Sequence, residues 1–267
     1  MSHLHPLLRS SFIAACAGFA LCLAATDASA QKKVPDGVKT LLLSGGQRQH
    51  HGYRDQALYL AGALEDTRGF QVTICEDAAV LTTPALRKYD LVIVAVDRRD
   101  DEFKFSEDQQ RALFDFVKSG RGYVSIHGGD NAPADWLPEW REMLGGIFSH
   151  VGKPNGRTKK GSWHVKIVDS SSPVTRGITD FDIKDELYYQ IQMQPDVEPL
   201  ATIEFEGTAW PVAWTRHYGK GRVFHTPLGH RDFGPGKDDP LRNPSLLKMI
   251  VQGARWAAGR DEAAAAK

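Results

Sequence analysis

Cysteine is scarce in this sequence of 267 residues, which contains only Cys16, Cys22 and Cys75. The first two lie in an apolar N-terminal segment that we expect to be removed, so the mature chain would keep Cys75 alone and could form no internal disulfide bond. Cys75 ends the β-favouring segment FQVTIC, where we expect a buried strand and a structural thiol. A cysteine nucleophile is therefore not expected.

The sequence also lacks an excess of charge of one sign, because 33 Lys and Arg balance 33 Asp and Glu. This balance argues against nucleic acid or an anionic membrane surface as the main partner. The apolar run at residues 11–25 is too short for a typical membrane-spanning helix. We therefore expect no membrane span.

The first thirty residues have the organisation of a secretory signal peptide. Arg9 provides a positive start, residues 11–25 are apolar, and residues 28–30 read A-S-A, a signal-peptidase pattern. The segment at 13–16 resembles a lipoprotein box, but it comes too early to leave a full apolar region before it. We predict cleavage after Ala30 and export to the periplasm or the exterior.

Buried strands alternate with amphipathic helices through the first half of the remaining chain. Strands are expected at 39–43, 70–75, 89–96 and 122–126, and helices at 55–65 and 106–119. This order predicts a three-layer α/β/α, flavodoxin-like fold around a mostly parallel sheet. In the second half, strands are expected at 163–168, 202–205, 211–216 and 221–226, with 202–205 at an edge, and helices at 136–144 and 243–258. Nothing marks a domain boundary, so we predict a signal peptide at 1–30, one domain at 31–260 and a frayed tail at 261–267.

One predicted strand ends in a histidine. Residues 123–126 favour a strand, and His127 follows at once, before Gly128 and Gly129. Because glycine adopts positive φ freely, the Gly-Gly pair predicts a sharp turn here. Ligands of open α/β sheets bind beyond the carboxyl ends of the strands. His127 is therefore a candidate acid, base or metal ligand, but a poor candidate for a stable acyl intermediate.

Several motifs resemble one known family when they are taken in order. They are SGGQRQHHGYRD (44–55), GRGYVSIHGGDN (120–131), the tryptophans 136 and 140, MLGGIFSH (143–150), DELY (185–188), PVAWTRHYGKGRVFHTPLGH (211–230) and WAAG (256–259). Together they resemble the ThuA-like, or trehalose-utilisation, family from about residue 38 to 259.

The resemblance implies a fold of the class I glutamine amidotransferase-like superfamily. It also implies a role in sugar catabolism, particularly of trehalose, related disaccharides and their 3-keto derivatives. Amidotransferases of this fold carry a cysteine at the turn where this chain has His127, so glutamine hydrolysis is not expected.

Five side chains are expected at the rim where the strands end: His51, His127, His150, Glu186 and His230. Topology alone brings three of the histidines together, because His51 follows the first strand, His127 the fourth and His230 the last. His150 and Glu186 are added by the family resemblance. We predict that His127, Glu186, His230 and His150 are catalytic.

Substrate contacts are predicted for His51, Asp130, Asn131, Tyr188 and Arg216. Asp130 and Asn131 follow the turn and could bind a sugar hydroxyl or, equally, stabilise the turn itself. Tyr188 and Arg216 could line the pocket.

Other polar side chains are expected to be structural. Asp185 is expected to cap a helix or to support Glu186, and Arg98 is expected in a solvated loop. Trp214 is expected in the core. A structural role is also expected for His164, His217 and His225.

Two chemistries remain open for this rim. His51, His127, His150 and His230 could bind a divalent metal such as zinc, which would polarise a carbonyl or activate water. Alternatively, a metal-free His/Glu site could remove the proton beside a ketone, in which case no cofactor is required. The sequence has no local H-x-x-H or H-E-x-x-H motif to favour the metal.

We therefore expect an exported protein of carbohydrate catabolism that eliminates, isomerises or hydrolyses a sugar or 3-keto-glycoside. A zinc-dependent hydrolase of another substrate and a non-catalytic carbohydrate-binding protein are the alternatives. The expected partner is a small-molecule sugar or keto-sugar, not nucleic acid or a membrane.

Overall fold

The computed structural model describes residues 37–46, 51–95, 97–98, 103–131, 136–148, 156–232 and 239–261, all within one compact unit. The predicted signal peptide, His150 and residues 262–267 lie outside the described residues. None of the described helices is both long and apolar enough to cross a membrane.

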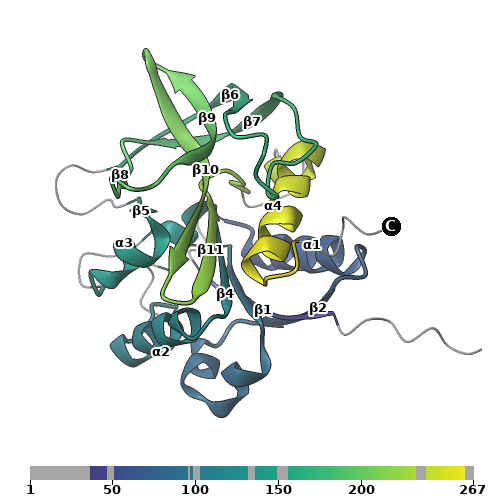
Figure 1. Ribbon diagram of the computed structural model, residues 1–267, viewed down its shortest axis with the longest axis vertical. Helices are drawn as coiled ribbons and strands as arrows, with labels where there is room; N and C mark the ends of the chain where they lie inside the picture. The colour runs from purple at the N-terminus through teal and green to yellow at the C-terminus, as the bar shows by residue number, and fades with distance from the viewer. Residues whose placement is uncertain are drawn as a thin grey trace, which may run out of the picture. The chain divides into compact units, whose positions relative to one another are not determined.

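A nine-stranded sheet forms the centre of this unit, in the order β2-β1-β3-β4-β11-β10-β9-β6-β7 (Figure 1). Its strands are β1 (Val38–Leu43), β2 (Phe70–Cys75), β3 (Leu91–Val94), β4 (Gly122–Ile126), β6 (Arg157–Ile167), β7 (Phe181–Tyr189), β9 (Pro199–Phe205), β10 (Thr208–Tyr218) and β11 (Gly221–Thr226). The five strands from β2 to β11 pair in parallel, and the pairs from β11 to β7 are antiparallel. The α/β fold class is confirmed, and the antiparallel extension makes the complete sheet mixed.

Helices cover both faces of the parallel strands, which gives the predicted three layers. The helices are α1 (Tyr53–Glu65), α2 (Glu107–Lys118), α3 (Glu139–Leu144) and α4 (Pro244–Ala257). Successive strand residues face opposite sides, so Leu42 belongs to the same buried cluster as Leu60 of α1 and Ile250 of α4, whereas Leu41 belongs to a second cluster with Val117 of α2. Figure 1 shows α1 and α4 on one side of these strands and α2 and α3 on the other.

Short elements complete the described fold. A two-stranded antiparallel sheet joins β5 (Gly146–Ile147) and β8 (Gln192–Met193). Four 3₁₀ helices are η1 (Ala78–Thr82), η2 (Pro84–Lys88), η3 (His127–Asp130) and η4 (Pro240–Arg242). The third of them follows β4 directly, so it holds the histidine that ends that strand.

Side-chain caps begin two of the helices, α2 and α4. At α2, the Ser106 hydroxyl accepts from the Gln109 N–H at 3.3 Å, and the Gln109 side chain accepts from the Ser106 N–H at 2.9 Å. At α4, the Asn243 side chain accepts from the N–H groups of Ser245 and Leu246. Both caps satisfy N–H groups that a helix leaves without internal partners.

The structure corrects several local predictions. β9 lies between β10 and β6, so its assignment to an edge was wrong. β2 is an edge strand, and Cys75 is half-buried instead of buried. The helix expected from Trp136 begins at Glu139. β7 was not predicted, and because Asp185 lies within this strand, it caps no helix.

Candidate functional site

The turn after β4 places His127 at the carboxyl edge of the parallel strands. Its backbone has a positive φ of 49°, which is uncommon for a non-glycine residue, whereas Gly128 and Gly129 are not among the positive-φ residues. The prediction that the glycines carry the positive φ was therefore wrong. Their role is to leave room, because a Cβ at Gly129 would lie 2.5 Å from the Val94 carbonyl oxygen.

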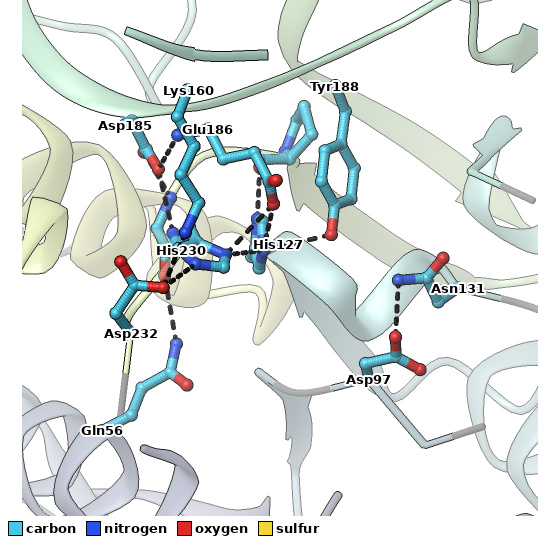
Figure 2. Close-up of polar contacts among 12 residues, drawn as sticks. Gln56, Asp97, His127, Asn131, Lys160, Asp185, Glu186, Tyr188, His230 and Asp232 are labelled. Carbon is cyan, nitrogen blue, oxygen red and sulfur yellow. Dashed lines mark hydrogen bonds and ion pairs between the residues drawn. The ribbon is translucent and has the colours of Figure 1, made fainter. Parts of the chain in front are cut away.

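His127 is buried, with 1% of its surface exposed, and each ring nitrogen has a defined partner. Nδ1 lies 2.9 Å from the carbonyl oxygen of Pro227. A carbonyl only accepts, so Nδ1 carries the proton and Nε2 presents a lone pair. This lone pair faces the Tyr188 hydroxyl at 3.1 Å and His230 Nδ1 at 2.9 Å (Figure 2).

His230 is held from its other side by a carboxylate. Its Nε2 lies 2.8 Å from Asp232 Oδ1, and Asp232 in turn accepts from Lys160 Nζ at 2.6 Å. Its Nδ1 faces the centre of the cluster, 3.1 Å from Glu186 Oε2. The chain Lys160–Asp232–His230 therefore runs from β6 into the site, as Figure 2 shows.

β7 contributes two side chains to the same centre. Glu186 Oε2 lies 3.7 Å from His127 Nε2, and the Glu186 side chain is 15% exposed. Tyr188, two residues on, projects on the same side of the strand, and its ring stacks on Phe148 with centroids 4.1 Å apart. One face of an edge strand thus supplies both the carboxylate and the hydroxyl.

Asp185 fixes the loop that carries His230. Its carboxylate accepts from the backbone N–H groups of Gly229 at 2.7 Å and His230 at 3.0 Å, and from that of Glu186 at 2.7 Å. Burial raises the pKa of Asp185 to about 7, against the opposing effect of these three donors. The predicted support of Glu186 is thus present, but it is shared with the His230 loop.

The electrostatics of the centre separate the roles of its two imidazoles. Burial, together with the neighbouring His230 and His51, lowers the pKa of His127 well below 6.5 and keeps it neutral. Burial opposes charge on His230 as well, but hydrogen bonds to Glu186 and Asp232 outweigh it and raise the pKa of His230.

The carboxylates of the centre stay ionised for the same reason. Burial alone would raise the pKa of Glu186, but the hydrogen bond and charge of His230 lower it. For Asp232, hydrogen bonds to Lys160 and His230 overcome burial and lower its pKa to about 2. At neutral pH the centre therefore contains carboxylates beside a readily protonated His230.

His51 is the third histidine that the structure brings to this centre. It is 5% exposed, and its ring centroid lies 5.3 Å from that of His127 and 5.0 Å from that of His230. One nitrogen from each of the three imidazoles lies within 4.8 Å of the other two. Three imidazole nitrogens this close could form a metal site.

Asp130 and Asn131 lie apart from the cluster. The Asp130 carboxylate contacts His225 Nε2 at 3.3 Å and accepts from the Phe148 N–H at 3.3 Å. Asn131 donates to Asp97 at 3.0 Å, in a pair that Figure 2 shows away from the histidines. These buried contacts fit the predicted turn-stabilising alternative better than contact with a sugar.

Arg216 and Arg98 also lie outside the centre. Arg216 donates to Asp196 at 2.7 Å, and its described bonds involve none of the clustered side chains. Arg98 was expected in a solvated loop, but it is 2% exposed and donates to the backbone carbonyls of Ser44 and Phe103. It therefore joins loops in the interior.

The other residues singled out from the sequence also lie outside the centre or outside the described residues. Trp214 is buried, and its ring lies tilted against that of His225 with centroids 4.5 Å apart, as predicted for a core residue. His164 is exposed and pairs with Asp182 at 2.8 Å. His150 lies outside the described residues, so its predicted catalytic role stays a prediction.

Two site residues were missed from the sequence. Asp232 is two residues after His230, and a carboxylate that close to a candidate histidine is a weak signal that could have been read. Lys160 gave no signal, because its contact with Asp232 joins residues 72 apart in the chain.

A wide concavity of about 650 Å³ lies elsewhere, at the amino ends of the parallel strands. Basic side chains line it, including Lys39, Arg87 and Arg121. None of the clustered histidines reaches it. The convergence of buried polar groups therefore places the candidate site at the carboxyl edge.

Comparison with known proteins identifies the family of this chain. Residues 39–257 match the ThuA family, described as trehalose utilisation. The chain belongs to the ThuA family. The match covers the strands and helices that hold His51, His127, Glu186 and His230, and the family description supports a carbohydrate-related function. No curated protein matches the chain.

Solved structures similar to this ThuA-family chain share its fold. A ThuA-like protein from Parabacteroides merdae is 23% identical, with a TM-score of 0.70 over 83% of this chain and 90% of its own. One from Bacteroides uniformis is 18% identical, with a TM-score of 0.67 over 84% and 93%. A β-galactosidase from Rahnella is 14% identical, with a TM-score of 0.56 over 85% of this chain but 31% of its own. At these identities the likeness concerns the fold alone.

Proposed function

We propose that this protein is an enzyme of carbohydrate catabolism that acts on 3-keto-glycosides through an acid–base site formed by His127, Glu186 and His230. One observation carries the proposal: a neutral imidazole, a carboxylate and a second imidazole converge within 2.9–3.7 Å in a largely buried centre. Such a set can remove one proton and donate another without moving far. The family's description as trehalose utilisation supports a sugar as the substrate.

The chemistry of a 3-keto sugar suits these groups. The ketone acidifies the C2 proton, which Glu186 takes as the base. The electron pair of the C2–H bond forms a C1=C2 double bond as the C1–O bond breaks, and the departing oxygen takes a proton from His230. The Tyr188 hydroxyl donates to the ketone oxygen, where negative charge develops. If the C1–O bond stays intact, the electron pair forms an enolate instead, and return of a proton to the opposite face of C2 gives the C2 epimer, which is an isomerisation. After elimination, water adds across the double bond, with a proton at C2 and hydroxide at C1, and the net result is hydrolysis.

His127 has a supporting part in this scheme. Its Nδ1–H is bound by the Pro227 carbonyl, so its Nε2 accepts from Tyr188 or His230. This lone pair accepts one hydrogen at a time, so while Tyr188 or His230 donates to it, the other is free to donate to the substrate. His127 is also in van der Waals range of Tyr188, since their ring centroids are 4.5 Å apart.

Two alternatives predict different results. A metal-dependent hydrolase of another substrate, favoured by the three convergent imidazoles, would cleave glycosides that carry no ketone. A non-catalytic carbohydrate-binding protein would bind sugar without forming product.

The test is an NMR time course of the mature protein with 3-keto-glycosides, including 3-ketotrehalose, and with their parent sugars. We expect product from the keto forms alone. Turnover of the parent sugars, or binding without turnover of any member, would reject the proposal in favour of one of the alternatives.

Export is part of the same proposal, because the signal-peptide pattern at 1–30 would place the enzyme among extracytoplasmic sugars. Intact-mass analysis of the protein from an osmotic-shock fraction should give a chain that begins at Gln31. An uncleaved chain that stays in the cytoplasm would contradict it.

A further inference from the structure

At the centre of the site, the lone pairs of His127 and His230 and the carboxylate of Glu186 lie close together. His127 Nδ1 donates to a carbonyl, so its Nε2 carries a lone pair and no proton. His230 Nε2 donates to the Asp232 carboxylate, so when His230 is neutral its Nδ1 also carries a lone pair. These two nitrogens are 2.9 Å apart, with Glu186 Oε2 3.1 Å from the second. Such a centre needs a cation, which is either a proton or a metal ion.

The position of His51 favours a metal ion over a proton. A proton on His230 joins His230 to His127 and Glu186 only. A metal ion would also use His51, whose ligand nitrogen lies within 4.8 Å of the other two. All three histidines are buried, at 5%, 1% and 8% exposure. Three buried imidazoles from three separate segments of the chain therefore converge.

The ring nitrogens of His127 and His230 that face away from the centre make the contacts that are usual for metal-binding histidines. Metal-binding histidines usually donate their second N–H to a carboxylate or a backbone carbonyl, which fixes the tautomer and the ring. His127 donates to the Pro227 carbonyl and His230 to Asp232. Lys160 then holds Asp232 in place at 2.6 Å.

We propose that His51, His127 and His230 bind one divalent transition-metal ion, with zinc as the expected ion. Nitrogen ligands about 2.0–2.1 Å from zinc at a tetrahedral angle lie about 3.3 Å apart, so the cluster needs to adjust by a few tenths of an ångström between His127 and His230. Three protein ligands with an open fourth position are typical of catalytic zinc.

This inference rests on the proposed function in that it concerns the same site. The metal ion would take the place of the proton as the cation of the centre and would polarise the ketone oxygen. Glu186 lies beside the three imidazoles without being needed as a ligand, so it would remain the base. His230, as a ligand, would no longer donate a proton, and Glu186 would pass the proton that it took from C2 to the departing oxygen.

The test is a zinc titration of the full mature chain after removal of metal with EDTA, read by competition with a chromophoric chelator. We expect one Zn²⁺ per chain, and with Co²⁺ a visible absorption band of a tetrahedral site. His230→Gln should weaken zinc binding about 100-fold or more, and Asp232→Asn about 10-fold to 100-fold.

The matched control is His164→Gln, which removes an exposed histidine that pairs with Asp182 on the surface. It should bind zinc like the unmodified protein. The proposal is overturned if the unmodified protein binds no zinc, or if the His230 and His164 variants bind it equally. Circular dichroism of each variant confirms that it is folded, and Asp232→Asn serves if His230→Gln is not.

Failure of this inference is distinguishable from failure of the proposed function. Keto-sugar turnover that persists in EDTA, with no zinc bound, rejects the metal and leaves the acid–base proposal standing. Zinc binding without turnover of any keto-sugar supports the metal and rejects the substrate.

Discussion

The direction in which each imidazole of the site presents its lone pair is set by its outer partner. Pro227 fixes His127, and Asp232 fixes His230. Positive φ at His127 adds backbone strain of about 1–3 kcal/mol, which the surrounding structure must offset. Strain of this size at a buried polar residue is a common feature of functional sites.

Tyr188 offers a separate test of this residue-level account. Tyr188→Phe removes the hydroxyl that lies 3.1 Å from His127 Nε2 but keeps the ring that stacks on Phe148. Keto-sugar turnover should fall about 100-fold to 1000-fold, as when one donor to a developing oxyanion is lost. The free energy of unfolding should fall by about 1 kcal/mol or less. Steady-state kinetics and urea denaturation measure both.

Tyr123→Phe is the matched control, because the Tyr123 hydroxyl is buried without a hydrogen-bond partner among the described residues. This variant should keep full turnover and equal or greater stability. If both variants lose activity alike, Tyr188 acts through packing and has no role as a donor.

The sequence predicts part of the residue-level site. His51, His127 and His230 follow the ends of parallel strands, and parallel strand ends share an edge, so their convergence is predictable. The prediction of Glu186 and Tyr188 as site residues required the family resemblance. Neither the Asp185 contacts with the His230 loop nor the Lys160–Asp232 pair could be predicted, since both join residues far apart in the chain.

Among the elements, the turn after β4 decides where His127 lies. Gly128 approaches Asp97 and Gly129 approaches Val94 and Ser125, so the chain can turn here only without side chains at both positions. The pattern I-H-G-G predicted a turn correctly, although the positive φ is at the histidine.

Gly129→Ala should disturb this turn. Its Cβ would lie 2.5 Å from the Val94 carbonyl oxygen and 2.8 Å from Ser125 Oγ, so the backbone must shift. We expect a loss of about 2 kcal/mol in the free energy of unfolding, typical of overpacking, together with a loss of turnover as His127 moves. Thermal and urea denaturation measure the first effect.

Gly62→Ala provides the comparison, because Gly62 is inside α1 and a Cβ there has no neighbour within 4 Å. Alanine should stabilise the helix by about 0.5–1 kcal/mol. Equal stability of the two variants would show that close packing does not constrain the turn.

The elements themselves were predictable where the pattern was simple. β3 is a continuous apolar run, and α2 begins with a capping box that is visible in the sequence. β7 escaped prediction because FDIKDELYY mixes charged residues on an exposed face with a buried Asp185, which masks the alternation of a strand.

At the scale of the whole molecule, the site depends on the bending of the sheet. β7 is four positions from β11 in the sheet order, which in a flat sheet would separate them by about 19 Å. Glu186 of β7 nevertheless comes within 3.7 Å of His127, which follows β4, the strand on the far side of β11. The antiparallel half therefore curls over the carboxyl edge of the parallel half, and no local sequence pattern could reveal this.

The central claim is that Glu186 removes the C2 proton of a 3-keto sugar. The most direct measurement is the exchange of that proton for deuterium in D₂O, followed by NMR on 3-ketotrehalose with the unmodified protein and with Glu186→Gln. We predict exchange or product deuteration well above the buffer rate with the unmodified protein, and a rate near that of buffer with the variant. Exchange at the buffer rate with both proteins, or equal acceleration by both, would contradict the account.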